Sequence, residues 1–284
     1  MRDDFCALIL THGRPDKVHT YFSLRRHGYT GKIYLVVDDE DKTLPRYQEN
    51  FGEENVLVFS KAEIAKTMDA GDNFARKSVV FARNATYDLA RQVGCTYFLE
   101  LDDDYSSFHF KFNENFEFGH WGMKDMDAII DIMIEFYDAS GCSTIAMAQG
   151  GDFIGGESGS YGSKVKLTRK AMNSFLCSTK KPFQFCGQLN DDVNTYTTLG
   201  RKGELLLTIN MVGLQQKETQ QNSGGLTELY LDMGTYVKSF YTVMYEPSCC
   251  VVTDFSTKHR RLHHRLKWDS VCPKIIREEH KRAT

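Results

Sequence analysis

Short apolar runs separated by helical patterns dominate the first hundred residues. Four runs have the composition of strands buried on both faces, which is typical of parallel strands covered by helices: Phe5–Leu10, Lys32–Val37, Val56–Phe59 and Thr96–Leu101. Between the last two, apolar residues from Ala82 to Val93 keep helical spacing, and Gly94 ends the stripe. The alternation predicts an α/β fold, with a Rossmann-like, mostly parallel sheet flanked by helices.

The second half is less regular. A helix is predicted at Met126–Tyr137, where apolar residues keep helical spacing, and strands are predicted at Thr144–Ala148, Leu205–Asn210 and within Cys249–Thr253. A glycine-rich stretch at 150–162 and a basic amphipathic segment at 164–175 lie between them. No repeat or proline-rich linker divides the chain. We therefore expect a single domain over residues 1–257, with halves at 1–110 and 111–257, followed by an extension at 258–284.

Composition places the chain among ordinary globular proteins. It has 284 residues, of which 41% are hydrophobic and 26% charged. No apolar stretch approaches the roughly 18–20 residues of a membrane span. The first residues lack the layout of a signal peptide, which leads us to expect a cytoplasmic protein, in the host cytoplasm if a phage encodes it. The eight cysteines are scattered without a CxxC pair, so they are interpreted as buried thiols.

The net charge of −3 hides an asymmetry. Residues 258–284 hold nine lysine or arginine residues against three acidic ones, a net charge of +6, which leaves −9 on the rest of the chain. A basic segment on an acidic protein favours contact with a polyanion such as DNA. The alternative is a solvated surface segment.

Three consecutive aspartates, Asp102, Asp103 and Asp104, follow the fourth predicted strand. Open α/β sheets bind ligands at the carboxyl ends of their strands. Mg²⁺ and Mn²⁺ prefer oxygen ligands, usually one or two carboxylates plus substrate phosphates. The triplet therefore predicts a divalent metal site, with a solvated turn as the alternative.

Other polar residues are expected at the same end of the sheet. The helix from Arg83 to Gly94 and the strand after it each span about 16 Å, so Arg83 and Asn84 are predicted to lie beside the aspartates. The first strand ends in a loop containing Thr11, Gly13 and Arg14, and the second ends in two carboxylates, Asp38 and Asp39. An arginine, a glycine-containing loop and carboxylates converging on one crevice favour a nucleotide-diphosphate site, to which Asp103 is also assigned.

This layout resembles the GT-A glycosyltransferases, which use nucleotide sugars. In that superfamily a carboxylate just before a helix serves as general base, which implies this role for Asp191 or Asp192 within Gly187–Asp192. Many members also carry a late metal-binding histidine, which implies His259 as a ligand beside Asp102 and Asp104, with His263 and His264 as alternatives.

The resemblance is closer still to the TET-associated glycosyltransferases of bacteriophages. It rests on five short segments: Thr11–Pro15, Asn190–Asn194, Thr219–Gln221, Gly224–Glu228 and Gly234–Lys238. It implies a GT-A enzyme that uses Mn²⁺ or Mg²⁺ and moves a sugar from a UDP-sugar to 5-hydroxymethylcytosine in phage DNA. In-line attack assisted by one base leads us to expect inversion at the sugar.

Three further interpretations remain open at the level of sequence. Nucleotidyltransferases have a related sheet and metal site, but they usually carry a longer glycine-rich loop than Thr11–Pro15 after the first strand. A noncatalytic DNA-binding protein would use the basic segment, but it would leave both acidic clusters unexplained, because carboxylates repel phosphate. A glycosyltransferase acting on an acceptor other than DNA is the third alternative.

Overall fold

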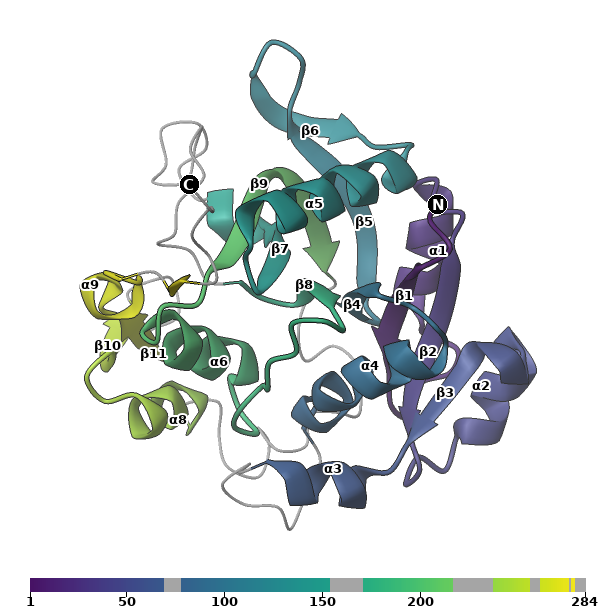
Figure 1. The fold of residues 1–284 in the computed structure, drawn as a ribbon, viewed down its shortest axis with the longest axis horizontal. Helices are drawn as coiled ribbons and strands as arrows, with labels where there is room; N and C mark the ends of the chain where they lie inside the picture. The colour runs from purple at the N-terminus through teal and green to yellow at the C-terminus, as the bar shows by residue number, and fades with distance from the viewer. Residues whose placement is uncertain (69–77, 154–170, 217–236, 256–260, 276, 279–284) are drawn as a thin grey trace.

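A computed structural model describes residues 1–68, 78–153, 171–216, 237–255, 261–275 and 277–278 of the chain. The described strands form a nine-stranded sheet in the order β3-β2-β1-β4-β8-β7-β9-β5-β6 and a separate two-stranded sheet, β10-β11. Helices cover both faces of the large sheet (Figure 1).

The N-terminal half alternates strands and helices as predicted. Its elements are β1 (Phe5–Leu10), α1 (His19–Arg26), β2 (Lys32–Asp38), α2 (Leu44–Phe51), η1 (Glu53–Asn55), β3 (Val56–Phe59), α3 (Lys61–Thr67), α4 (Val80–Gln92) and β4 (Tyr97–Asp102). Strand β1 lies between β2 and β4 and is parallel to both, and β2 is parallel to β3. All four predicted strands are confirmed.

The C-terminal half adds strands of both directions. Its elements are β5 (Tyr105–Phe112), β6 (Phe118–Gly122), α5 (Met126–Ser140), β7 (Thr144–Gln149), η2 (Gly150–Phe153), β8 (Ser174–Ser178), α6 (Asp191–Gly200), β9 (Leu206–Gln216), α8 (Val237–Tyr245), β10 (Cys250–Phe255), β11 (Arg261–Leu266) and α9 (Trp268–Val271). Strand β8 is antiparallel to both β4 and β7, so β7 and β9 run in the same direction as β1–β4. The predicted single α/β domain with a mostly parallel sheet is confirmed.

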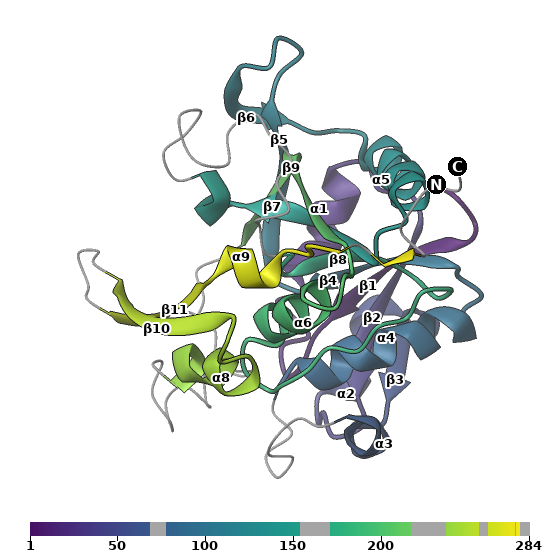
Figure 2. The same ribbon diagram turned by 60° about the vertical axis from the view of Figure 1, so that its left-hand side comes forward.

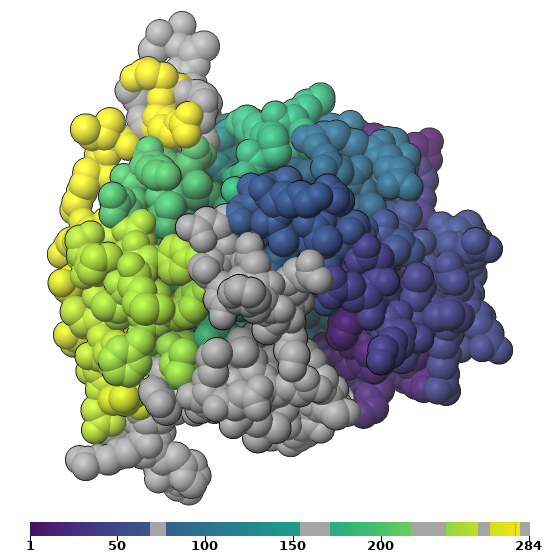
Figure 3. Space-filling view, turned by 90° about the horizontal axis from the view of Figure 1, so that it is seen from below, coloured from purple at the N-terminus to yellow at the C-terminus, as the bar shows by residue number. Residues whose placement is uncertain are grey.

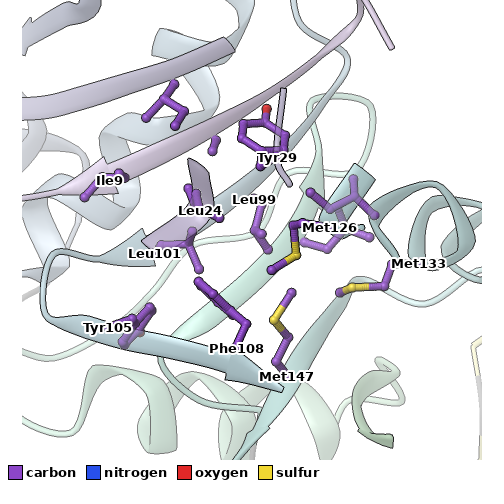
Figure 4. Packing of buried hydrophobic residues seen from close by; sticks show 14 of the residues in the cluster. Ile9, Leu24, Tyr29, Leu99, Leu101, Tyr105, Phe108, Met126, Met133 and Met147 are labelled. Atoms are coloured by element: carbon purple, nitrogen blue, oxygen red, sulfur yellow. The ribbon is translucent and has the colours of Figure 1, made fainter. Parts of the chain in front are cut away.

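Strand β1 shows why the sheet needs helices on both sides. Its side chains alternate between two apolar clusters, with Phe5, Ala7 and Ile9 in one and Cys6 and Leu8 in the other. The first cluster packs against α1 and α5, and the second packs against α4 and α6. Figure 4 shows the first cluster, where side chains of β4 and β5 meet methionines of α5 and β7.

Four strands went unrecognised in the sequence: β5, β6, β8 and β11. The β5–β6 hairpin begins directly after the aspartate triplet and projects from the body at the top of Figure 1. Phe108, Phe110 and Phe112 alternate along β5, a signal for a strand that the sequence carries openly. The basic segment predicted at 164–175 is described only from residue 171, and its last residue, Phe175, lies in β8.

The C-terminal residues differ from the predicted extension. Strand β11 pairs antiparallel with β10 across the boundary drawn at 257/258, from Cys250↔Leu266 to Phe255↔Arg261. After β11 in the chain, α9 packs on α6. Val271 is fully buried there, and the ring of Trp268 meets that of Tyr196 edge-on, with ring centres 5.9 Å apart. Figures 1 and 2 show α6, α8, β10–β11 and α9 gathered at one side of the molecule. Residues 261–271 therefore belong to the domain, because they bury apolar side chains against it.

Two expectations drawn from composition concerned the cysteines and membrane-spanning segments. All eight cysteines are free thiols, and six are buried. No helix in the described parts of the chain is both long and apolar enough to cross a membrane.

Truncation tests the place of the C-terminal residues. A chain ending at Thr257 would lose β11 and the buried side chains of Leu266 and Val271, so we expect its melting temperature to fall by roughly 10 °C or more. A chain ending at Pro273 keeps these elements and should melt close to the full-length protein. Equal melting temperatures for the two truncations would show that β11 and α9 do not stabilise the domain. Circular dichroism thermal scans provide the measurement.

Candidate active site

Asp103 holds the loop after β1 against the end of β4. It is 1% exposed, and its Oδ2 accepts a hydrogen bond from Thr11 Oγ1 at 2.7 Å and lies 3.0 Å from Arg14 Nε. Burial raises the pKa of Asp103 to about 7, against the opposing effect of Arg14. Asp103, predicted to belong to the donor site, thus holds the end of β1 against the end of β4.

Gly13 gives the loop its shape. Its φ of +71° lies in the left-handed region, which favours glycine, and its N–H donates to Asp41 Oδ2 at 2.7 Å. The next residue, Arg14, donates its N–H to the Tyr47 hydroxyl at 2.9 Å. No described atom lies within 4 Å of where a Cβ on Gly13 would stand, so a ligand can approach the backbone closely here.

The two carboxylates after β2 have different environments. Asp38 is buried and pairs with His12 Nδ1 at 2.6 Å and with Lys61 Nζ at 3.0 Å. The bond to Asp38 raises the pKa of His12 above its ordinary value. Asp39 is exposed and accepts the Lys61 N–H at 3.1 Å. Of the two, Asp39 is the carboxylate left open to a ribose or base, and sequence reasoning missed the role of Lys61.

The turn from β4 to β5 presents Asp102 and Asp104. Thr20 fixes it, because its Oγ1 donates to the Asp102 carbonyl at 2.6 Å and accepts the Tyr105 N–H at 2.9 Å. The Asp104 Oδ2 accepts a hydrogen bond from Gln216 Nε2 at 3.1 Å. Its Oδ1 is buried and has no hydrogen-bond partner among the described residues. Burial, reinforced by the charge of Asp102, raises the pKa of Asp104 to about 6.

These properties fit a divalent cation. An unpartnered carboxylate oxygen beside a second carboxylate, in a partly buried site, is an environment that a hard cation would stabilise. In the described parts of the chain, no group of three or more His, Cys, Asp or Glu side chains is placed to hold a metal. Two carboxylates with the remaining ligands from substrate phosphates and water are the usual arrangement for Mg²⁺. The predicted ligand His259 lies outside the described residues.

Arg83 connects the end of β4 to the start of α6. Its buried guanidinium lies 2.5 Å from Glu100 Oε1 and 3.1 Å from Asp102 Oδ1. On its other side, Arg83 Nε lies 2.7 Å from Asp191 Oδ2. The rings of Phe175 and Phe185 lie 5.1 and 5.6 Å from its central carbon. One cation therefore joins the predicted metal site to the predicted general base. Its position beside Asp102 is the one that the helix geometry predicted, whereas its contact with Asp191 was not predicted.

The two aspartates that open α6 are unequal. Asp191 is 5% exposed, and burial raises its pKa to about 7, with Arg83 opposing. Asp192 is half-buried, and its Oδ1 accepts the N–H of the next residue, Val193, at 2.8 Å. Before them, Asn190 has a left-handed φ of +53° and donates its side-chain amide to the Lys238 carbonyl of α8 at 2.6 Å. The start of α6 is thus positioned by α8.

Asn84 does not join this site. Its side-chain amide makes a pair of hydrogen bonds with the Phe185 backbone, accepting the N–H at 2.8 Å and donating to the carbonyl at 3.0 Å. Adjacent residues on a helix point about 100° apart, so Asn84 turns away where Arg83 faces the sheet. The structure therefore corrects the predicted nucleotide contact: Asn84 anchors the segment before α6.

Three strand ends and the start of α6 now define one acidic site. In Figure 3, the purple and blue N-terminal elements and the lime segment from α8 onward lie on opposite sides of one face. The family profile described as TET-Associated Glycosyltransferase matches residues 5–225. The chain belongs to this family. The resemblance seen in the sequence is confirmed, and with it the prediction that the protein is a glycosyltransferase.

Solved structures of other proteins are similar at low sequence identity. Glucosyl-3-phosphoglycerate synthase from Mycobacterium tuberculosis, in complex with Mn²⁺ and UDP-glucose, has a TM-score of 0.47 at 9% identity, over 92% of this chain and 86% of that one. S. aureus TarS 1-349 has a TM-score of 0.44 at 9% identity, over 85% of this chain and 65% of that one. No curated protein matches the sequence.

Arg83 can be compared with another arginine of the same helix. Arg83→Met leaves buried carboxylates without their cation, so we expect the free energy of unfolding to fall by about 3–5 kcal/mol. Arg91 forms an exposed pair with Asp88 at 2.6 Å, so Arg91→Met should cost at most about 1 kcal/mol. Urea denaturation measures both. A loss for Arg83→Met no larger than that for Arg91→Met would contradict a central role for the buried cation.

Proposed function

We propose that this TET-associated glycosyltransferase transfers a sugar from a UDP-sugar to the hydroxyl of 5-hydroxymethylcytosine in DNA, with a divalent metal. The observation that carries the proposal is the buried contact of Arg83 with both Asp102 and Asp191. Arg83 holds Asp102, whose carboxylate suits the leaving-group side of the reaction, close to Asp191, whose carboxylate suits activation of the nucleophile. Glycosyl transfer needs these two functions at adjacent positions.

The donor side is built from β1, β2 and β4. Asp102 and Asp104 would hold Mn²⁺ or Mg²⁺, which when bound supplies positive charge to the departing diphosphate. Arg14 is 23% exposed at its side chain beside the open backbone of Gly13, where it can meet a phosphate. Asp39, which is exposed, would accept hydrogen bonds from the nucleoside. The loop after β1 and the turn after β4 would thus bind the diphosphate between them.

The acceptor side is built around α6. We assign the general base to Asp191, because a base works best when its pKa lies near the working pH and that of Asp191 is raised to about 7. The acceptor O–H proton passes to its carboxylate as the oxygen bonds the sugar carbon and the sugar–phosphate bond breaks toward UDP. Asp192 is the alternative base. Attack opposite the leaving group would invert the sugar.

The DNA acceptor rests on the family and on the chemistry of the hydroxyl. A primary alcohol such as a hydroxymethyl group is a poor nucleophile that needs a positioned base, which the start of α6 supplies. A hydroxymethylated base in phage DNA is the acceptor that the resemblance to the family implies. Mass spectrometry of DNA containing 5-hydroxymethylcytosine, after incubation with a panel of UDP-sugars and Mn²⁺, tests the acceptor. Sugar appearing only on a non-DNA acceptor would overturn it.

Metal dependence is tested at Asp104. Asp104→Asn keeps the size of the side chain but removes a negative charge from the predicted metal site, so we expect turnover to fall by roughly 100-fold or more. EDTA should abolish wild-type turnover, and Mn²⁺ should restore it. Asp88→Asn, at an exposed position on α4, is the matched control and should be fully active. Wild-type turnover persisting in excess EDTA would remove the metal from the proposal.

The general base is tested by paired variants. Asp191→Asn should lower kcat by roughly 100-fold or more while UDP affinity, measured by calorimetry, changes little, because a base acts in the transition state. Asp192→Asn should retain most of the turnover. The reverse pattern would assign the base to Asp192. Near-normal kcat in both variants would place the base elsewhere.

A further inference from the structure

A second polar cavity lies beside the acidic site. It has a volume of about 250 Å³, and its polar lining comes from four strands: His109 and Lys111 of β5, His120 of β6, Gln149 of β7, and Gln215 and Gln216 of β9. We call it the His–Lys pocket. None of its side chains has a role in the chemistry proposed above except Gln216, which donates to Asp104.

Lys111 is a buried cation without a matching anion. It is 2% exposed, and its Nζ lies 2.9 Å from His120 Nε2 and 4.4 Å from the centre of the Phe153 ring. Among the described residues, no carboxylate lies within ion-pair distance of it. Burying an ammonium group without an anion is costly. The contact with the Phe153 ring face offsets only part of that cost, so the pocket favours an anionic ligand.

The two histidines are fitted closely around this lysine. His109 and His120 stack with ring centres 4.5 Å apart. A Cβ at Gly213 would lie 2.7 Å from His109 Nε2 and 3.2 Å from Lys111 Cε, so any larger residue there would displace these side chains. His109 Nε2 and Gln149 Nε2 are buried and have no hydrogen-bond partner among the described residues. Two residues that line the cavity beside Lys111 thus each carry a buried polar atom without a partner among the described residues.

The pocket has a defined position relative to the chemistry. Tyr105 pairs with Gln216 at the acidic end of β9, and His109 pairs with Gly213 farther along. Gln216 follows Gly213 by three residue steps along the strand, a distance of about 10 Å. The pocket therefore begins at the hydrogen bond to Asp104 and extends about 10 Å from the metal site. A substrate bound for transfer can reach both places at once.

We propose that the His–Lys pocket binds a phosphate of the acceptor DNA strand. That the ligand is a DNA strand rests on the proposed function. That the pocket binds an oxyanion rests on its own residues. A phosphodiester carries one negative charge, which matches the single buried ammonium, and its oxygens accept hydrogen bonds from the Gln149 amide and from a histidine N–H. A carboxylate on the donor sugar is the other source of an oxyanion within reach.

Phosphate binding can be measured without DNA or catalysis. Inorganic phosphate titrated into the wild-type protein should shift the ring ¹⁵N resonances of His109 and His120, because the anion contacts Lys111 and the rings. The same titration with chloride at equal ionic strength is the control. Histidine resonances that respond equally to phosphate and chloride would overturn the pocket as an oxyanion site. This result does not depend on which acceptor receives the sugar.

Lys111→Met tests the link to DNA. It keeps the apolar stem over Phe153 and removes the charge, so the fold should persist, which a thermal scan confirms. We expect affinity for a short unmodified single strand to fall about tenfold or more, and the slope of log K against log salt to flatten by about 0.7. Lys180→Met is the matched control. Lys180 is exposed and lies two residues after Ser178, the last residue of β8. Ser178 pairs with Tyr97, which is at the opposite end of β4 from Asp102.

The outcomes separate the two sources of the oxyanion. Unchanged DNA affinity and salt slope in folded Lys111→Met would overturn the proposal. A raised KM for a UDP-hexuronate, with DNA binding unchanged, would show that the pocket binds the carboxylate of the donor sugar instead. Because the strand carries no hydroxymethyl group, loss of binding supports the phosphate site even if sugar transfer to 5-hydroxymethylcytosine is never observed. That failure would instead count against the proposed function.

Discussion

The site depends on one buried guanidinium. Arg83 is taken out of water by the rings of Phe175 and Phe185, and three carboxylates compensate it: Glu100, Asp102 and Asp191. Arginine suits this position because its planar group can meet several carboxylates in different directions, whereas a lysine presents a single point charge. Its contacts fix the end of β4 and the start of α6 relative to each other, and these are the elements that carry the two proposed halves of the chemistry.

Even with Arg83, the cluster carries an excess of negative charge. Five carboxylates gather here against two guanidinium groups, those of Arg14 and Arg83: Glu100, Asp102, Asp103, Asp104 and Asp191. Burial and mutual repulsion raise the pKa of Glu100, Asp103 and Asp191 to about 7. A divalent cation bound at Asp102 and Asp104 would offset much of the repulsion. The imbalance is thus a physical reason for metal dependence that the aspartate triplet alone does not supply.

The sequence predicted the parts of this arrangement that local patterns encode. The strands β1–β4 are buried on both faces, so their apolar runs are continuous, and Arg83 could be placed by counting residues along α4. The same counting misplaced Asn84, because length fixes height along a helix but the direction of each side chain depends on its rotation. Lys61 was missed because its contact with Asp38 joins an unremarkable helix start to another strand end.

The acceptor side was harder to predict because distant segments build it. The amide of Asn190, just before Asp191, bonds α8, and its Nδ2 lies 3.4 Å from the ring of His264 in β11. Charge composition marked residues 258–284 as a tail, yet β11 ends with Arg265 exposed between the buried residues His264 and Leu266. Charged side chains on a two-stranded edge also keep it from pairing with other chains. Composition could not separate this use of charge from a DNA-binding tail.

The packing of β11 and α9 on the domain bears on how an acidic protein could approach DNA. With β11 and α9 built into the domain, groups within the folded part of the chain can also contribute attraction to phosphate. The buried Lys111 lies against Gly213, about 10 Å along β9 from Gln216. It acts mainly on a strand that is already docked, since its charge interacts strongly where water is excluded and is screened by solvent outside the pocket. Such a group fixes the position of a bound strand more than it attracts DNA from a distance. The acidic centre repels phosphates placed near it, and the His–Lys pocket offers one defined place where a phosphate is stabilised.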